Sequence, residues 1–323
     1  MPALAQRVAP LLPAHALISA FADDVIAGLA AQPKRIPPKY FYDEEGSRLF
    51  EAITQLPEYY PTRSELEILS THAADIAAFI PQDATLVEFG SGSCRKVRLL
   101  LDAAPNLRAY VPVDISAGFL DGQVALLRRD YRGLAVEPVA ADFTANFALP
   151  QHLRAGPRVG FFPGSTIGNF EPHEATDFLR HAAAMLGRGA AFIIGVDLLK
   201  SPDMLNAAYN DAAGVTRLFN LNLLARINRE LDADFDLDRF DHCAFYDGTK
   251  RRIEMHLVSL AAQTVSVAGY PMAFRAGETI HTENSYKFTP ESFAALARRA
   301  GWMARAMWTD AERRFAVYAL ALA

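Results

Sequence analysis

The sequence predicts an α/β fold in which a parallel sheet is covered by helices on both faces and is joined to a second lobe. Apolar, strand-like runs alternate with helical patterns from about residue 84 to residue 197, which is typical of a parallel sheet. The stretch LVEFGSGSCRK (86–96) places two glycines directly after one such run, as in turns that hold nucleotide-like ligands. Between about residues 200 and 285 the alternation stops, and this change of pattern indicates the second lobe.

Composition narrows the class of protein. The chain has 323 residues, of which 51% are hydrophobic and 21% are charged, as in ordinary globular proteins. Its net charge is −5 and its longest basic run is Lys250-Arg251-Arg252, so we expect no nucleic-acid partner. No apolar run approaches the ~20 residues that span a bilayer. The apolar start of the chain is interrupted by three prolines, so we expect neither a membrane partner nor a signal peptide.

The cysteines and histidines exclude further classes of site. Cys94 and Cys243 are too few for a disulfide framework or a metal cluster, and they fit a reducing compartment. His242 and His256 have no metal-ligand spacing to a nearby cysteine or acid. We therefore expect a cytoplasmic protein without a metal, and we expect a monomer.

The amino-terminal part is predicted to be helical. Apolar residues at helical spacing predict a helix over about 17–31, which the proline-rich segment 32–39 ends. Two further helices flank the turn LPEYYPTR (56–63). The second is expected to begin near Thr62, because Thr62 and Glu65 have the spacing of a capping box.

The central part gives the parallel sheet. Strands and helices are predicted in alternation, with strands at 85–89, 109–114, 134–140, 157–162 and 190–197 and helices at 95–103, 117–129 and 173–186. Ligands of such sheets bind beyond the carboxyl ends of the strands, near the switch in strand order.

The rest of the chain forms the second lobe and a closing hairpin. A helical stretch is expected at 202–230, and short strands such as 252–261 follow. The segment 287–323 is predicted to form a helix followed by two strands. We place the two strands as an antiparallel hairpin beside the parallel sheet. The predicted domains are therefore 64–198 with 287–323, and 1–63 with 199–286.

The glycine turn favours one class of cofactor. Gly90 and Gly92 let the backbone approach a ligand closely. A dinucleotide fingerprint has a third glycine where this chain has Arg95, and we expect that side chain to crowd the helix against the strand. NAD and FAD are therefore disfavoured, whereas S-adenosylmethionine has no pyrophosphate and does not need the third glycine.

Acidic residues follow the neighbouring strands. Glu88 precedes the turn, Asp114 ends the second strand, and Asp142 with Phe143 ends the third. Asp114 has the spacing of a carboxylate that binds ribose hydroxyls, while Asp142 and Phe143 suit an adenine ring. Each acid alone is better explained as a cap or a surface carboxylate, and a glycine pair alone usually marks a turn. Their occurrence at successive strand ends, together with the stretch 161–169 at the same edge, favours a nucleotide-type ligand.

With these residues in view, the chain resembles the histidine-specific Nα-methyltransferases of ergothioneine biosynthesis, a family that includes fungal N-methyltransferases of tryptophan derivatives. The matching stretches extend over most of the chain, and the first and the PGSTIGNF stretch are the most specific. They are PKYFYDEEGSRLFEAITQLPEYYPTRSE, LVEFGSGSCRKVRLLLDA, YVPVDIS, FFPGSTIGNFEP, AYN (208–210) and TENSYKF (282–288).

The resemblance implies a class I methyltransferase Rossmann-like domain with a second, substrate-binding lobe. It implies S-adenosylmethionine as cofactor and L-histidine as the small-molecule substrate, methylated to the trimethyl betaine hercynine. The implied cofactor-binding residues are Glu88, Gly90, Gly92, Lys96, Asp114, Asp142 and Phe143. The implied substrate-binding residues are Tyr42, Tyr59, Gly164, Asn169, Tyr209, Met255, Glu283 and Ser285, with Tyr59 and Asn169 as the catalytic pair.

Glu283 and Ser285 carry the expected specificity. A carboxylate pairs with an imidazole N–H and a hydroxyl serves the other ring nitrogen, whereas an apolar pocket suits tryptophan. On composition alone Glu283 is better explained as a solvated acid. Asn284 stands where the family pattern has an aliphatic residue, which matters only if its side chain faces the imidazole.

Alternative functions stay open. The chain could methylate another amino acid, such as tryptophan or tyrosine, or it could be a non-catalytic cofactor-binding module. A dehydrogenase is disfavoured by Arg95.

Overall fold

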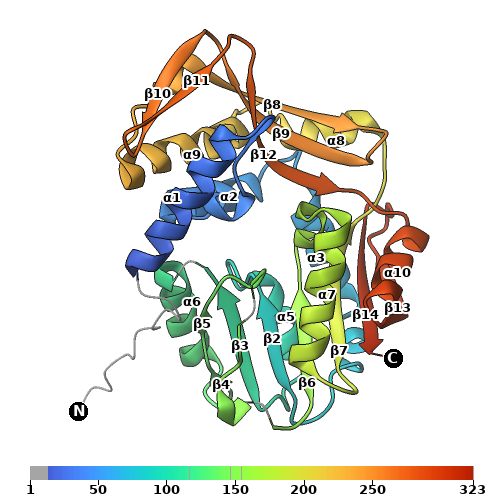
Figure 1. Cartoon of the computed structure of the whole chain (residues 1–323). Coiled ribbons are helices and arrows are strands. Elements are labelled where there is room, and N and C mark those ends of the chain that lie inside the picture. Colours follow the sequence, from blue (N-terminus) through green and yellow to red (C-terminus); the bar gives the residue numbers. More distant parts are fainter. Residues whose placement is uncertain (1–13, 116, 146, 154, 323) are drawn as a thin grey trace. The chain divides into compact units, whose positions relative to one another are not determined.

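The computed structural model describes residues 14–115, 117–145, 147–153 and 155–322, which belong to two compact units (Figure 1). Among the described residues, unit 1 contains Pro61–Leu199 and 287–322, and unit 2 contains 14–60 and Lys200–Tyr286. The functions that we assign to the two domains stay predictions. Residues 1–13, which we placed in the second lobe, lie outside the described residues.

Unit 1 is built on an eight-stranded sheet. Its order is β13-β14-β7-β6-β2-β3-β4, and β5 also pairs with β3. The strands from β7 to β5 are parallel, whereas β14 runs antiparallel to β7 and β13 runs antiparallel to β14. The strands are β2 (Thr85–Phe89), β3 (Ala109–Asp114), β4 (Ala135–Val136), β5 (Val139–Ala140), β6 (Arg158–Phe162), β7 (Ala191–Asp197), β13 (Trp302–Thr309) and β14 (Phe315–Leu322). The expected parallel sheet and closing hairpin are confirmed.

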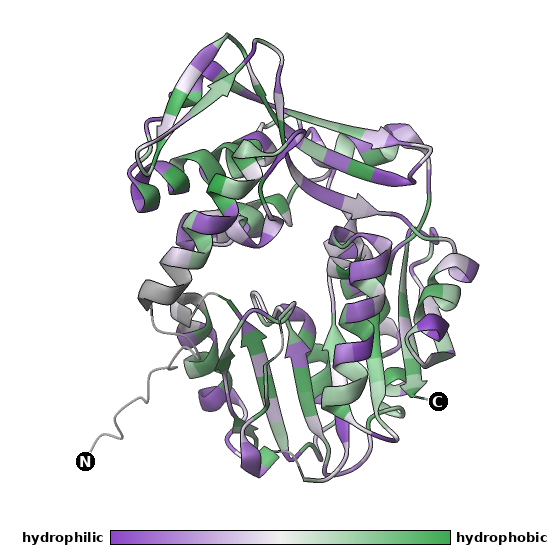
Figure 2. Ribbon diagram, in the orientation of Figure 1, coloured by the Kyte–Doolittle hydropathy of each residue, from purple (hydrophilic) through white to green (hydrophobic). Residues whose placement is uncertain are grey.

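Helices cover both faces of this sheet because alternate side chains of its strands enter two different cores. Val87 and Phe89 pack with α7 and α10, whereas Leu86 packs with the helices of the opposite face. Figure 2 shows α7 striped in purple and green, as expected for a helix with one face in a core. The helices are α3 (Tyr60–Thr71), α4 (Ala73–Ala77), α5 (Arg95–Ala103), α6 (Ala117–Asp130), α7 (Pro172–Leu186) and α10 (Pro290–Arg299).

The predicted strand 134–140 is wrong in its extent. It is divided into the two-residue strands β4 and β5. Between them lies Pro138, which has no N–H to donate to a sheet, and Glu137 N–H bonds Tyr110 O at 2.9 Å.

The predicted start of α3 is also wrong. The helix begins at Tyr60 rather than near Thr62, so Thr62 lies inside its first turn. Glu65 makes other contacts that sequence spacing could not reveal, because its partners are distant in the chain.

Unit 2 combines helices with two small sheets. The larger sheet has the order β1-β12-β9-β8 and the smaller one pairs β10 with β11. The strands are β1 (Lys34–Arg35), β8 (Phe240–Asp247), β9 (Arg252–Ser259), β10 (Gln263–Val267), β11 (Tyr270–Phe274) and β12 (Thr279–Tyr286). The helices are α1 (Ala14–Ala30), α2 (Glu44–Ile53), α8 (Pro202–Tyr209) and α9 (Val215–Leu231).

The single helical stretch predicted at 202–230 is two helices. The chain leaves α8 after Tyr209 and re-enters a helix at Val215. Gly214 has φ +72°, and the Asp211 carboxylate accepts the N–H groups of Val215 and Thr216 at 2.8 Å. These bonds begin α9 as a separate helix. Among the described residues, no helix has the length and apolar character needed to cross a membrane.

Candidate functional site

The glycine turn joins β2 to α5 in unit 1. Gly90 has φ +72° and Gly92 has φ +48°, a region of backbone angles that favours glycine. Gly90 N–H bonds Val113 O at 2.8 Å, which fixes the turn against β3. A Cβ on Gly90 would lie 3.3 Å from Phe143 Cε1. Two of the predicted cofactor residues, Gly90 and Phe143, are therefore in contact.

Asp114, the last residue of β3, also reaches this turn. Its Oδ2 accepts the Gly92 N–H at 3.3 Å. Asp142 and Phe143 lie in the loop after β5, where the Asp142 carboxylate accepts the Thr144 N–H at 2.9 Å. The strand ends thus bring Gly92 and Asp114 together, as the spacing predicts. They also bring Phe143 next to Gly90.

Cys94 and Arg95 complete the turn. Cys94 is buried, and burial raises the pKa of its thiol to about 12, so the thiol stays protonated. Arg95 begins α5 with an exposed side chain. Because this side chain does not pack between helix and strand, the expectation that Arg95 crowds them is wrong. Crowding at residue 95 therefore does not exclude a dinucleotide.

Glu88 occupies a different environment from the other predicted acids. It is 1% exposed, and the Tyr110 hydroxyl donates to its Oε2. Burial raises its pKa well above the usual range, although the hydrogen bond from Tyr110 and the charge of Lys96 oppose this shift. Burial thus favours the protonated form of this carboxyl group by raising its pKa, and the cofactor role of Glu88 stays a prediction.

Lys96 belongs to a cluster that the sequence did not predict. Its Nζ lies 2.7 Å from Glu65 Oε2. The two carboxylate oxygens of Glu65 also accept the Gly164 N–H, at 3.0 and 2.8 Å. The spacing of Thr62 and Glu65 predicted a capping box, and only the tertiary structure shows that Glu65 contacts two predicted site residues.

Gly164 and Asn169 flank a short turn after β6. Gly164 has φ +79°, and the 3₁₀ helix η3 (Thr166–Asn169) follows. Asn169 is half-buried at the end of η3. Both residues belong to unit 1, so they are in the same unit as the glycine turn rather than in the unit that contains Glu283.

In unit 2, a β-bulge sets the direction of the predicted specificity residues. The pairing of β12 with β9 shifts between His281 and Glu283, so that Glu283 lies opposite Met255 and Ser285 lies opposite Ile253. A bulge re-aims the side chains that follow it. Glu283, Ser285 and Met255 are all buried, with exposures of 9%, 4% and 2%.

Tyr209 completes this group from α8. Its hydroxyl donates to Ser285 Oγ at 2.7 Å, and its ring lies 6.3 Å from the Tyr59 ring, edge to face. Tyr59 is also buried. We call Tyr59, Tyr209, Met255, Glu283 and Ser285 the substrate cluster.

A row of aromatic rings continues from Tyr59. Phe50 lies 6.2 Å from Tyr59, and Tyr42 lies 5.7 Å from Phe50. Phe219 lies within 6.0 Å of both Tyr42 and Phe50. Phe50 and Phe219 were not predicted. Phe50 lies within the long matching stretch, but an aromatic residue at helical spacing there is not distinguishable from a core residue.

Asn284 points away from the substrate cluster. Its Oδ1 lies 2.9 Å from His281 Nε2, and on β9 it lies opposite Glu254 rather than Met255. The departure from the family pattern at residue 284 therefore does not alter the face that carries Glu283.

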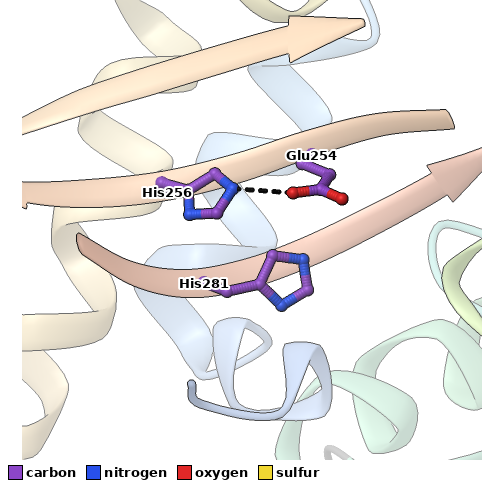
Figure 3. A group of neighbouring side chains, drawn as sticks. All are labelled: Glu254, His256 and His281. Carbon is purple, nitrogen blue, oxygen red and sulfur yellow. Dashed lines mark hydrogen bonds and ion pairs between the residues drawn. The ribbon is translucent and has the colours of Figure 1, made fainter. Parts of the chain in front are cut away.

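On that opposite face, Glu254, His256 and His281 point toward one another (Figure 3). Their ligand atoms lie within 4.8 Å of one another, a proximity that sequence spacing missed because His281 comes from another strand. Burial opposes ionisation of Glu254, but hydrogen bonds from Lys250, Arg252 and His256 lower its pKa to about 2. A metal dication would have to enter beside the two cations that already bind this carboxylate. The charges therefore favour an ion-pair network over a metal site.

Comparisons with known proteins identify the family of the chain. The family described as histidine-specific, S-adenosylmethionine-dependent methyltransferase matches residues 21–322. The histidine N-alpha-methyltransferase of Mycolicibacterium smegmatis is 46% identical over 308 residues, which cover 94% of this chain and 95% of that protein. The 4-dimethylallyltryptophan N-methyltransferase of Aspergillus fumigatus is 28% identical and covers 95% of each chain.

The ergothioneine biosynthesis protein 1 of Neurospora crassa is 31% identical over 86% of this chain, which spans 32% of that longer protein. The sheet order and the family match together identify a class I, Rossmann-like methyltransferase that uses S-adenosylmethionine. The chain belongs to the family of S-adenosylmethionine-dependent, histidine-specific methyltransferases.

Proposed function

We propose that this chain transfers methyl groups from S-adenosylmethionine to the α-amino nitrogen of L-histidine. The product is the trimethyl betaine hercynine, and the reaction is a step of ergothioneine biosynthesis. The family match and the relative from Mycolicibacterium smegmatis, named for the same activity, support this proposal.

The observation that carries the proposal is the buried acid of the substrate cluster. Glu283 is 9% exposed, on the same strand and face as Ser285. A carboxylate oxygen at this position can accept a hydrogen bond from an imidazole N–H. Ser285, which accepts a bond from Tyr209, can donate to the second ring nitrogen. An indole ring has only one N–H and no acceptor, so it would leave this pair incompletely bonded.

Methyl transfer from a sulfonium to an amine requires little from the protein beyond positioning the reactants. The sulfonium is already an activated donor, so the protein mainly orients the amine and excludes water. The α-amino group must be neutral to attack, and its usual pKa near 8 leaves a useful neutral fraction. Tyr59 accepts an N–H bond and aims the lone pair, and Asn169 binds the amine and the carboxylate. We propose that Gly90, Gly92, Lys96, Asp114, Asp142 and Phe143, with Glu88 beneath the turn, bind the donor.

Successive methylation increases the charge and bulk of the product. Each transfer removes one N–H, and the final product is a fixed cation. Aromatic rings can stabilise such a cation, and Tyr42, Phe50, Tyr59 and Phe219 form a row of packed rings next to Tyr209. Trimethylation is part of the proposal because the family relation implies it.

We also propose a cytoplasmic monomer. Cys94 and Cys243 are both free thiols, which supports a reducing compartment.

Replacing Glu283 tests the substrate assignment. Glu283→Gln keeps the shape of the side chain but removes its charge. We expect kcat/KM for histidine to fall by about tenfold to a hundredfold, the loss of one charge-assisted hydrogen bond. The affinity for S-adenosylhomocysteine should not change.

Glu254→Gln is the matched control, because Glu254 is an equally buried carboxylate on the opposite face of the same sheet. We expect its kcat/KM for histidine to stay near that of the parent. Full histidine turnover by Glu283→Gln would remove Glu283 from the pocket and reopen tryptophan or tyrosine as substrate.

A further inference from the structure

Glu65 is a buried carboxylate that joins three segments of unit 1. It lies on α3, is 0% exposed, and its Oε2 is 2.7 Å from Lys96 Nζ in the first turn of α5. It also accepts the Gly164 N–H from the loop after β6. These two partners are residues that we assign to the site, but Glu65 itself has no assigned role.

The fold leaves room for this carboxylate at a specific position. Gly195 lies inside β7, where glycine weakens a strand. A Cβ on Gly195 would lie 2.0 Å from Glu65 Oε1, which is far inside van der Waals contact. Glycine at 195 is therefore explained by the space that Glu65 occupies.

The Lys96 ammonium is bound by Glu65 but is still partly accessible. An ammonium group has three N–H donors, and the Glu65 carboxylate uses one of them. The Lys96 side chain remains 20% exposed, whereas Glu65 is fully buried. A Cβ on Gly164 would lie 3.4 Å from Lys96 Nζ, so the ammonium also lies against the Gly164 backbone. The remaining donors can therefore bind a second carboxylate.

We propose that Glu65 is a positioning residue for the methyl donor. It holds the Lys96 ammonium where the amino-acid carboxylate of the donor binds, and its bond with the Gly164 N–H fixes the position of the Glu65 carboxylate itself. This inference rests on the proposed role of Lys96 in donor binding.

Two effects of Glu65 on donor affinity have opposite signs. Its negative charge repels the donor carboxylate, so its removal would tighten binding if Coulomb repulsion dominated. It also restricts Lys96, and without it the lysine regains rotamer freedom that binding must remove again. The sign of the change on Glu65→Gln therefore distinguishes positioning from simple repulsion.

Calorimetry with S-adenosylhomocysteine tests the proposal on Glu65→Gln, Lys96→Gln and the double variant. We expect each single change to raise Kd by about tenfold, as for loss of one charge-assisted contact. If Glu65 acts through Lys96, the double variant should bind no more weakly than Lys96→Gln alone. An unchanged or tighter Kd for Glu65→Gln, or losses that multiply in the double variant, would overturn the proposal.

Asp310→Asn is the matched control. Asp310 is a buried carboxylate of unit 1 that bonds Ser64 on α3 at 2.9 Å and pairs with Arg314 at 3.0 Å. Its replacement should leave the Kd for S-adenosylhomocysteine unchanged, and an equal loss there would mean that both acids act only through stability. If Glu65→Gln does not fold, Gly195→Ala displaces the same carboxylate, and normal affinity in that variant contradicts the proposal.

Binding is measured without an amino acid, so the substrate assignment and this inference fail separately. In turnover assays, Glu65→Gln should raise KM for S-adenosylmethionine by a larger factor than KM for the acceptor. A parent enzyme that methylates another amino acid would refute the histidine assignment and leave the Glu65 test intact.

Discussion

Asp114 connects the end of β3 to the glycine turn through a single side chain. Its carboxylate accepts the Gly92 N–H, so the acid and the turn that we assign to the donor are held at hydrogen-bonding distance. The half-buried position of Asp114 suits a carboxylate that bonds ribose hydroxyls. We propose that the same residue both shapes the turn and binds the ligand.

We predict that Asp114→Asn weakens donor binding because it replaces a charged acceptor by a neutral one. The expected loss is ~1–3 kcal/mol in the binding free energy of S-adenosylhomocysteine, measured by calorimetry. Asp102→Asn serves as control, since Asp102 is a carboxylate on α5 whose partner is the Tyr131 hydroxyl at 2.7 Å. An unaltered dissociation constant for Asp114→Asn would contradict the ribose role.

Single residues also show where sequence reasoning reached its limit. The contacts of Gly92 with Asp114 follow from strand order, because parallel strands end at one edge of the sheet. Glu65 was interpreted as part of a capping box with Thr62, and its true partners, Lys96 and Gly164, are 31 and 99 positions away. Local spacing carries no signal for such pairs.

At the scale of elements, the bulge in β12 decides which side chains face the substrate cluster. Side chains alternate along a strand, so His281 and Glu283 would share a face without it. The extra residue, Thr282, moves Glu283 to the face of Met255 and leaves His281 beside His256. Thr282 itself is buried, and its hydroxyl lies 2.9 Å from Asn220 Oδ1 and 3.1 Å from Met255 O.

We predict that Thr282→Val destabilises the protein and impairs acceptor binding together. It leaves the buried Asn220 Oδ1 without its donor, which costs ~1–3 kcal/mol in the free energy of unfolding. KM for histidine should rise because the bulge that orients Glu283 loses its anchor. Urea unfolding and steady-state kinetics measure both quantities.

Thr264→Val, at an exposed position of β10, is the control for this substitution and should change neither quantity. Destabilisation of Thr282→Val with an unchanged KM would show that the bulge does not govern the pocket.

Elements with strong periodic patterns were predicted well, and those broken by local chemistry were not. The strands 85–89 and 109–114 and the helix 95–103 have the predicted bounds. The stretch 202–230 was predicted as one helical stretch, but Asp211 and Gly214 begin a new helix within it. The bulge in β12 was not predicted, since TENSYKF contains no glycine or proline to mark it.

At the scale of the whole molecule, the two units differ in the groups that titrate near neutral pH. His242, His256 and His281 all lie in unit 2, and burial lowers the pKa of each below its usual value. In the unfolded chain these histidines take up protons near pH 6.5. Between that pH and the lower folded pKa, the unfolded state binds more protons, so the stability from these groups is lost as pH falls.

The contribution of Glu88, in unit 1, to the free energy of unfolding changes with pH in the opposite direction. Its folded pKa is raised, so the folded state binds more protons above about pH 4.5, and its contribution to stability decreases as pH rises. Between pH 7.5 and 5.5, acidification therefore destabilises unit 2 and does not destabilise unit 1 through Glu88.

We predict that lowering the pH from 7.5 to 5.5 increases local opening of unit 2 selectively. Hydrogen exchange, corrected for the intrinsic pH dependence of the amide rate, measures this for peptides of each unit. His281→Gln should reduce the pH response of unit 2. Equal protection losses in both units, or a larger loss in unit 1, would contradict the assignment of neutral, buried histidines.

The most direct test of the proposed function measures which amino acid acquires methyl groups. The purified chain is incubated with isotope-labelled S-adenosylmethionine and, separately, with L-histidine, L-tryptophan and L-tyrosine, and the products are identified by mass spectrometry. The buried Glu283–Ser285 pair predicts that histidine alone is converted. The proposed trimethylation predicts that its α-amino nitrogen gains three labelled methyl groups. Methylation of tryptophan or tyrosine but not of histidine would contradict the account.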